Sequence, residues 1–161
     1  MKNQSKPTIV VRLDTSSNST IVLLYACHIA QKSCFAVQIL AVMDAPAKGL
    51  LFASKMMEKD KRIQIERKLK KIIESTSKET GIVPTISIRE GDVVREIAAE
   101  IKSIPEAIML ILGKSYSHQS DNNVLPKLSS QIGSKIKVPV LIVPENLGTE
   151  NIEKLFTGCC K

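Results

Sequence analysis

The residues of this chain best suited to binding a ligand lie in the polar stretch Lys114–Asn123, which follows an apolar run, Ala107–Leu112, and Gly113. This loop stands between an expected strand and an expected helix, where α/β folds hold phosphates on backbone N–H groups. It has the length of a nucleotide-binding loop but few of the glycines that let a backbone approach a phosphate closely. The side chains that could meet an anion there are Lys114, Ser115, Ser117, Lys127 and Ser129.

Other residue types capable of catalysis or metal binding are spread along the chain. Asp14, Asp44 and Asp92 each follow an expected strand and could form a metal or acid–base site. Carboxylates at such positions more often cap helices or close turns, which is the role we expect. His28 and His118 lack neighbours at the spacing of a zinc site or a catalytic triad. We therefore expect no metal site, no catalytic residue and no enzymatic activity.

Apolar runs alternate along the chain with segments of helical spacing. Continuous apolar runs are typical of strands buried on both faces of a parallel sheet. The expected strands are Thr8–Leu13, Cys34–Met43, Val83–Ile88, Ala107–Leu112 and Val138–Val143. The expected helices are Thr20–Lys32, a long one ending near Glu79, Val93–Lys102, and a last one capped by Asn122 or Asn123 with Leu125, Leu128, Ile132 and Ile136 inward. The alternation predicts a three-layer α/β fold with a parallel sheet and right-handed crossovers.

The length and the charge of the chain limit its organisation and its partners. The 161 residues are expected to form one domain, with a core at about 7–145 and a tail at 146–161 that shows no packing pattern. The net charge is +7, and within Lys55–Lys71 eight residues are Lys or Arg while three are Asp or Glu. We expect this run to be the solvated face of a helix. An RNA- or anion-binding module is the alternative, although aromatic residues are scarce.

Cysteine spacing and apolar segments indicate the compartment. Cys27, Cys34, Cys159 and Cys160 show no metal-ligand spacing, and we expect reduced thiols in a cytoplasmic protein. The two terminal cysteines belong to an expected frayed tail, with a redox role as the alternative. Neither a signal peptide nor a run of about 20 apolar residues is found. We therefore expect no membrane partner. The scarcity of aromatic residues also argues against a nucleic-acid partner. Protein partners stay open.

Several segments of the chain match one known family in order and spacing. They are Val10–Ser16, Leu40–Asp44, Glu90–Asp92 with Glu96–Ile97, Leu112–Gly113 and Val138–Pro144. Each is loosely similar alone, but together they resemble the universal stress protein family over about residues 7–145. The resemblance implies a five-stranded parallel sheet of order 3-2-1-4-5, similar to that of the adenine nucleotide alpha hydrolases.

The resemblance also bears on nucleotide binding. ATP-binding members of the family carry Gly-x2-Gly-x9-Gly-[Ser/Thr] after the fourth strand, and here these positions are Gly113, Tyr116, Pro126 and Lys127. Tyr116 disfavours positive φ, and Pro126 has no N–H to donate, although proline suits the first turn of a helix. The chain thus resembles the class that does not bind ATP, and no cofactor is expected.

Features shared with the ATP-binding class support an alternative hypothesis, in which the protein binds a nucleotide. The resemblance makes Asp14 a contact to the adenosine portion and Val42 a backbone contact to adenine. A nucleotide-sensing switch binding ATP or AMP would use these two residues with Gly113 and the polar side chains of the loop and following helix. Those side chains are Lys114, Ser115, Lys127 and Ser129.

The leading expectation is a non-catalytic, dimeric stress-response or interaction protein. The resemblance implies homodimers formed through the last strand, which would bury Val138, Val140 and Ile142. Pro139 and Pro144 also favour an edge position for that strand, because proline lacks the N–H that a central strand donates. The alternative is that the tail after Asn146 covers this edge.

Overall fold

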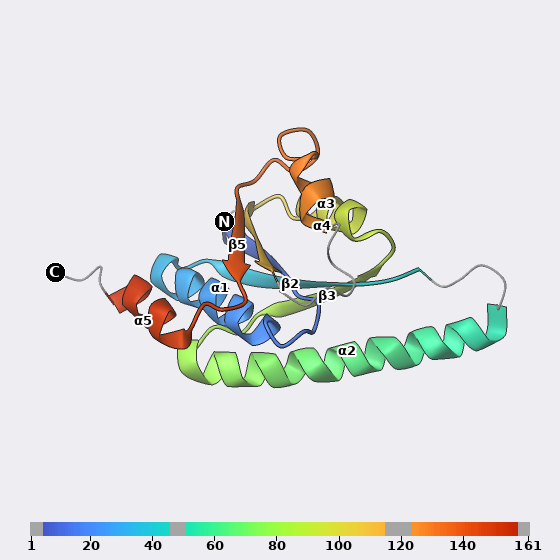
Figure 1. Ribbon diagram of the computed structural model, residues 1–161, viewed down its shortest axis with the longest axis horizontal. Coiled ribbons are helices and arrows are strands. Elements are labelled where there is room, and N and C mark those ends of the chain that lie inside the picture. Colours follow the sequence, from blue (N-terminus) through green and yellow to red (C-terminus); the bar gives the residue numbers. More distant parts are fainter. Residues whose placement is uncertain (1–4, 46–50, 115–123, 158–161) are drawn as a thin grey trace.

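The computed structural model describes residues 5–45, 51–114 and 124–157, with the side chains of 51–54 left aside. Its sheet contains five strands: β1 (Thr8–Arg12), β2 (Ala36–Met43), β3 (Thr85–Glu90), β4 (Ala107–Lys114) and β5 (Val140–Pro144). All four pairings are parallel, and the order is β3-β2-β1-β4-β5 (Figure 1). The expected strand order is therefore confirmed.

Helices cover both faces of the sheet and complete the three layers. They are α1 (Ser19–Ser33), α2 (Leu51–Thr80), α3 (Val93–Ser103), α4 (Val124–Ser129) and α5 (Thr149–Thr157). One buried cluster joins the sheet to α1 and α2, and a second joins the opposite face to α3 and α4. In the part of the chain that is described, no helix is long and apolar enough to cross a bilayer.

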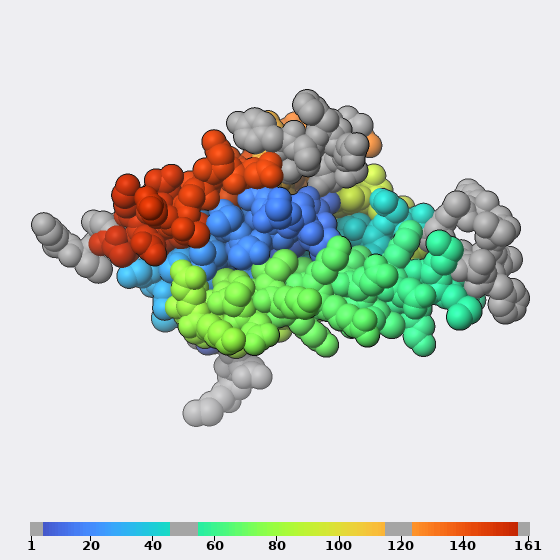
Figure 2. All heavy atoms as spheres, turned by 60° about the horizontal axis from the view of Figure 1, so that its bottom comes forward, coloured from blue at the N-terminus to red at the C-terminus, as the bar shows by residue number. Residues whose placement is uncertain are grey.

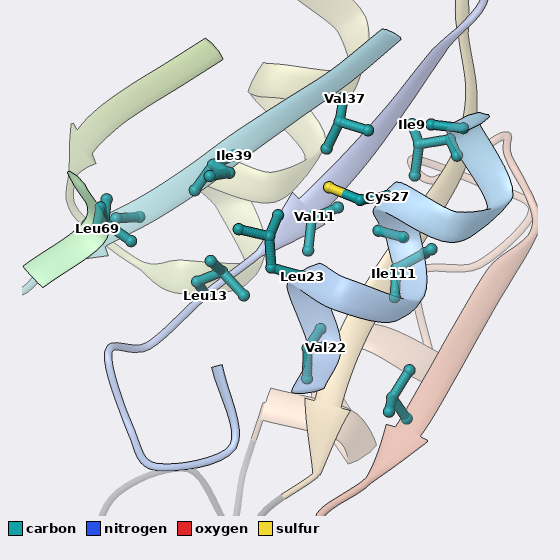
Figure 3. Packing of buried hydrophobic residues seen from close by; sticks show 14 residues of the cluster. Ile9, Val11, Leu13, Val22, Leu23, Cys27, Val37, Ile39, Leu69 and Ile111 are labelled. Carbon is teal, nitrogen blue, oxygen red and sulfur yellow. The ribbon is translucent and has the colours of Figure 1, made fainter. Parts of the chain in front are cut away.

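The central strand β1 shows why a continuous apolar run predicts a buried strand in this sheet. Ile9 and Val11 point into the cluster beneath α1, as Figure 3 shows, while Val10 belongs to the cluster on the other face. All three side chains are fully buried. A strand between two helical layers must be apolar on both sides, since each side chain enters one core or the other.

Edge strand β3 carries a polar face toward α3 that meets a buried carboxylate. Glu100 of α3 is 3% exposed, and its Oε2 accepts from Arg89 Nε at 2.5 Å and from Ser87 Oγ at 3.1 Å. Its Oε1 accepts from Gln38 Nε2 at 3.2 Å, and Thr85 Oγ1 donates to Oε1 of the Gln38 side chain. The hydrogen bond to Glu100 raises the pKa of Arg89 above its ordinary value. These contacts tie α3 to β2 and β3.

The last expected helix is much shorter than the sequence pattern predicted. Leu128 and Ile136 are buried as expected, but α4 ends at Ser129 and Ile132 is 50% exposed. Ser129 Oγ donates to the carbonyl of Pro126 at 2.8 Å, and Gly133 has φ +86°. Such side-chain bonds compete with helical ones, and positive φ does not occur within a helix. The capping asparagines at 122 and 123 lie outside the described residues.

The tail was expected to show no packing pattern, and this was wrong. Helix α5 packs on α1 with Ile152 fully buried, and Phe156 stacks on His28 at 5.3 Å between ring centroids. The ring of Tyr25 meets the ring of Phe156 edge-on, at 5.4 Å between ring centroids. The spacing of Ile152, Leu155 and Phe156 is the helical signal that the sequence offered. The terminal cysteines at 159 and 160 lie outside the described residues.

Candidate functional site

A hollow of about 220 Å3, open to solvent, lies where β1 and β4 end beside the start of α1. This is where parallel α/β sheets bind ligands, because the carboxyl ends of the strands meet helix N-termini there. The hollow includes space that is open to solvent, so the part enclosed by the protein is smaller than this volume. Its lining consists of Arg12, Leu13, Asp14, Ser16, Asn18, Ser19, Val22 and Gly113.

Asp14, expected to close a turn or to touch a ligand, has a defined role in the turn. Its Oδ1 accepts from the backbone N–H of Ser16 at 2.9 Å and from Ser19 Oγ at 3.2 Å. Its Oδ2 lies 3.9 Å from Arg12 Nη1. Thr15, which lies between Asp14 and Ser16 in the turn, has φ +62°, a strained conformation for a β-branched residue. The carboxylate therefore holds a strained β1–α1 turn, and the turn-closing role is confirmed.

Asn18 is a polar residue of this site that the sequence reading missed. It is buried, and its Nδ2 donates to the carbonyl of Lys114 at 3.4 Å. Among the residues that the structure describes, its Oδ1 finds no hydrogen-bond partner. Asn18 thus links the start of α1 to the end of β4 across the hollow. Asparagine is a common residue just before a helix, which is the signal that its type offers. The link to Lys114 joins distant parts of the chain and cannot be predicted from that signal.

Gly113, the one retained position of the glycine motif, is required by packing. A Cβ added there would lie 2.7 Å from Val22 Cγ2 and 3.0 Å from Asn18 Nδ2. The first distance is shorter than any ordinary carbon–carbon contact. Gly113 lies within β4 and does not have positive φ, so its backbone conformation would admit another residue. The close approach of β4 to α1 is what requires glycine.

The other expected ligand contacts are only partly brought together. Val42 is half-buried on β2 against the core beneath α3, and Lys114 ends β4 with an exposed side chain. Lys127 and Ser129 are exposed on α4. None of these four side chains lines the hollow. Ser115, Tyr116, Ser117 and His118 lie outside the described residues.

The other residues that were considered for catalysis or metal binding either have structural roles or lie outside the lining of the hollow. Asp92 accepts from the backbone N–H of Arg95 at 3.0 Å and caps α3, as expected. Asp44 is exposed after β2. His28 lies on α1, with Nε2 3.4 Å from Glu79 Oε1. Over residues 5–45, 51–114 and 124–157, no three His, Cys, Asp or Glu side chains are grouped to hold a metal ion.

A parallel sheet of order 3-2-1-4-5 with helices on both faces defines a doubly wound α/β architecture, and the hollow lies at the carboxyl ends of β1 and β4. The sequence profile of the Universal stress protein family matches residues 7–144. This chain belongs to that family. A comparison with curated protein sequences finds no significant match.

Solved structures of the same family share the fold at low sequence identity. Universal stress protein UspA from Lactobacillus plantarum has a TM-score of 0.71 and 16% identity, covering 88% of this chain and 99% of its own. A universal stress protein in complex with cAMP has a TM-score of 0.60 and 19% identity, covering 89% and 100%. The universal stress protein from Archaeoglobus fulgidus in complex with dAMP has a TM-score of 0.62 and 14% identity, covering 85% and 96%.

Proposed function

We propose that this universal stress protein is a non-catalytic, cytoplasmic, homodimeric protein that acts through protein contacts and works without binding ATP. The carrying observation is the contact geometry of Gly113, whose absent side chain leaves room for Val22 and Asn18. The only glycine left from the ATP motif is therefore needed by the fold, and its presence does not indicate a phosphate site.

The second retained feature, Asp14, supports the same proposal. Its Oδ1 is engaged with Ser16 N–H and Ser19 Oγ, both within the turn that leads into α1. A carboxylate that holds a strained turn has a reason to be present in the absence of any ligand. Pro126 adds to this, because it replaces a backbone donor where the family pattern has glycine.

Isothermal titration of the protein with Mg-ATP, AMP, cAMP and dAMP tests this proposal. We expect no saturable heat, which corresponds to dissociation constants weaker than about 1 mM. The Archaeoglobus fulgidus relative titrated with dAMP serves as the positive control, because it was solved as a complex with that nucleotide.

Saturable binding at micromolar affinity would favour the second candidate, a nucleotide-sensing switch. Two relatives of similar fold were solved in complex with cAMP and with dAMP, which is the observation in its favour. In that case Asp14→Asn, which keeps the Oδ1 acceptor of the turn, and Lys127→Ala should each weaken binding, with circular dichroism used to establish that both variants are folded. A binding signal that neither substitution alters would mean that the nucleotide occupies another site.

The proposed dimer uses the outer edge of β5. This strand ends the sheet, and Ile142 is 48% exposed beside the half-buried Val140, while Val138 precedes the strand. The described tail folds back as α5 on α1, and β5 pairs with β4 alone among the strands of the sheet. An exposed apolar edge favours pairing with a second chain.

The mass of the protein in solution, measured by light scattering after size exclusion, tests the dimer. We expect a dimer for the natural chain and a monomer for Ile142→Asp, since a carboxylate buried in the interface would be unpaired. Ile132→Asp is the matched control, because Ile132 is equally exposed but lies outside the strand. A monomeric natural chain, or a control that dissociates equally, would overturn the edge-strand proposal.

A further inference from the structure

The outer side of helix α2 combines cations with exposed apolar side chains. We call the six residues Met56, Lys59, Ile63, Arg67, Lys70 and Lys71 the basic ridge. They are all exposed, with Met56 74% and Ile63 36% accessible. Helical spacing places them on one side of α2 over a length of about 22 Å. Figure 2 shows α2 (green) as an uninterrupted ridge across that face of the molecule.

The inner side of α2 fixes the ridge outward. Leu69 is fully buried, and Ile65 and Ile72 pack beside it against the cluster beneath α1. Nearer the N-terminus of the helix, Arg62 Nη2 donates to the carbonyl of Ile88 on edge strand β3 at 3.2 Å. Because one side of α2 is committed to the core and to β3, the ridge cannot turn inward and is available for a partner.

The charges of the ridge are not neutralised within the molecule. In the described part of the chain, no ion pair involves Lys59, Arg67, Lys70 or Lys71. Of the three acidic residues between Lys55 and Lys71, Glu58 and Glu66 are half-buried. The third, Asp60, is exposed on the same side of α2 as the ridge, where one carboxylate stands among four cations. The excess of positive charge over this length favours an extended anionic partner and disfavours pairing of α2 with a second copy of itself.

The apolar members of the ridge decide which anionic partner fits. Met56 and Ile63 stand seven residues apart between the cations, with Met57 61% exposed beside them. A nucleic acid backbone offers no apolar surface for such side chains, whereas an anionic bilayer offers headgroup charge and, just beneath it, hydrocarbon. We propose that the basic ridge docks this protein on anionic phospholipid surfaces, with α2 lying in the plane of the interface.

This partner differs from the sequence-based expectation of no membrane contact. That expectation rested on the lack of a spanning segment, and a helix lying on the surface needs none. The basic run was then interpreted as a solvated helix face, because the sequence alone did not place Met56 and Ile63 on the side away from the core. The helix and its outward face agree with that interpretation, and the proposal concerns what this face binds.

Co-sedimentation with phosphatidylcholine vesicles, with and without phosphatidylserine, tests the proposal. We expect binding only to the anionic vesicles, falling as salt rises. The triple variant Lys59→Gln, Arg67→Gln, Lys70→Gln is expected to lower partitioning roughly 100-fold, about fivefold for each cation. The matched control replaces exposed lysines elsewhere, Lys32, Lys102 and Lys135, by glutamine, and should bind much more strongly than the ridge variant at equal net charge.

A second pair of variants tests the apolar contribution. Met56→Ser with Ile63→Ser is expected to lower partitioning about tenfold, because apolar area returns to water. Val83→Ser with Ile132→Ser, also exposed and apolar, is the control. Circular dichroism establishes that each variant is folded. Absence of binding to anionic vesicles, equal loss in a control, or no effect of the apolar pair would overturn the proposal. Tighter binding to polyuridylate than to anionic vesicles would also overturn the proposal and would identify RNA as the partner of the basic ridge.

Discussion

Replacing Glu100 by alanine is expected to lower the free energy of unfolding by about 3 kcal/mol, because a buried and paired charge is removed from its partners. Glu100 is almost fully buried and accepts hydrogen bonds from Arg89, Ser87 and Gln38. Its removal leaves three donors without their acceptor. Arg89 is 30% exposed, so water relieves part of the loss at that donor. Urea denaturation followed by circular dichroism measures the change.

Three further substitutions identify the origin of the loss of stability in Glu100→Ala. Glu100→Gln keeps one acceptor and should cost less, while Lys102→Ala on the exposed side of α3 should change stability by less than about 0.5 kcal/mol. Adding Arg89→Ala to Glu100→Ala should cost little further if the two side chains act as a pair. Additive losses from the two substitutions would show that the network described between α3 and β3 does not couple them.

Replacing Gly113 by alanine is expected to destabilise the protein by about 2 kcal/mol, a typical penalty for overpacking a core contact. The new methyl group would lie 2.7 Å from Val22 Cγ2. The loss should appear in the absence of any nucleotide, because it arises from the approach of β4 to α1. Thermal unfolding with and without nucleotide separates this packing role from a ligand role.

Shortening the opposing side chain tests the contact directly. In a Val22→Ala background, Gly113→Ala should cost less than about 1 kcal/mol, because the clash is removed and the contact with Asn18 alone is left. Gly148→Ala is the control, since a Cβ there meets nothing within 4 Å. An unchanged penalty for Gly113→Ala in the Val22→Ala protein would contradict the packing explanation.

The sequence predicted the fold well where one signal dominated. The apolar runs around Val10 and Ile111 belong to strands buried on both faces, and no other local structure explains such runs between helices. Asp92 and Asp14 were expected to cap or to close turns, and they do so through neighbouring backbone N–H groups. These interactions are local, which is why residue type and position were sufficient.

The candidate site was predicted less well because its contacts join distant segments. Gly113 was interpreted as the remnant of a phosphate-binding motif, but the atoms that require glycine belong to α1, far earlier in the chain. The carbonyl of Lys114 likewise meets Asn18 across the hollow. Helix α4 was overextended because serine side chains and Gly133 ended it against a favourable apolar pattern. The spacing of apolar residues within one segment does not show whether side-chain hydrogen bonds or a glycine will end the helix early.

The central place of β1 has a consequence for how the chain is made. β1 is the first of the five strands to be synthesised and its neighbour β2 follows it closely, but its other neighbour, β4, begins only at Ala107. Until that segment leaves the ribosome, one side of Ile9, Val10 and Val11 is an unpaired apolar edge, the kind of edge that recruits other chains. Nascent chains that end before Ala107 should therefore depend most on chaperones, and aggregation during synthesis should fall sharply once β4 has emerged.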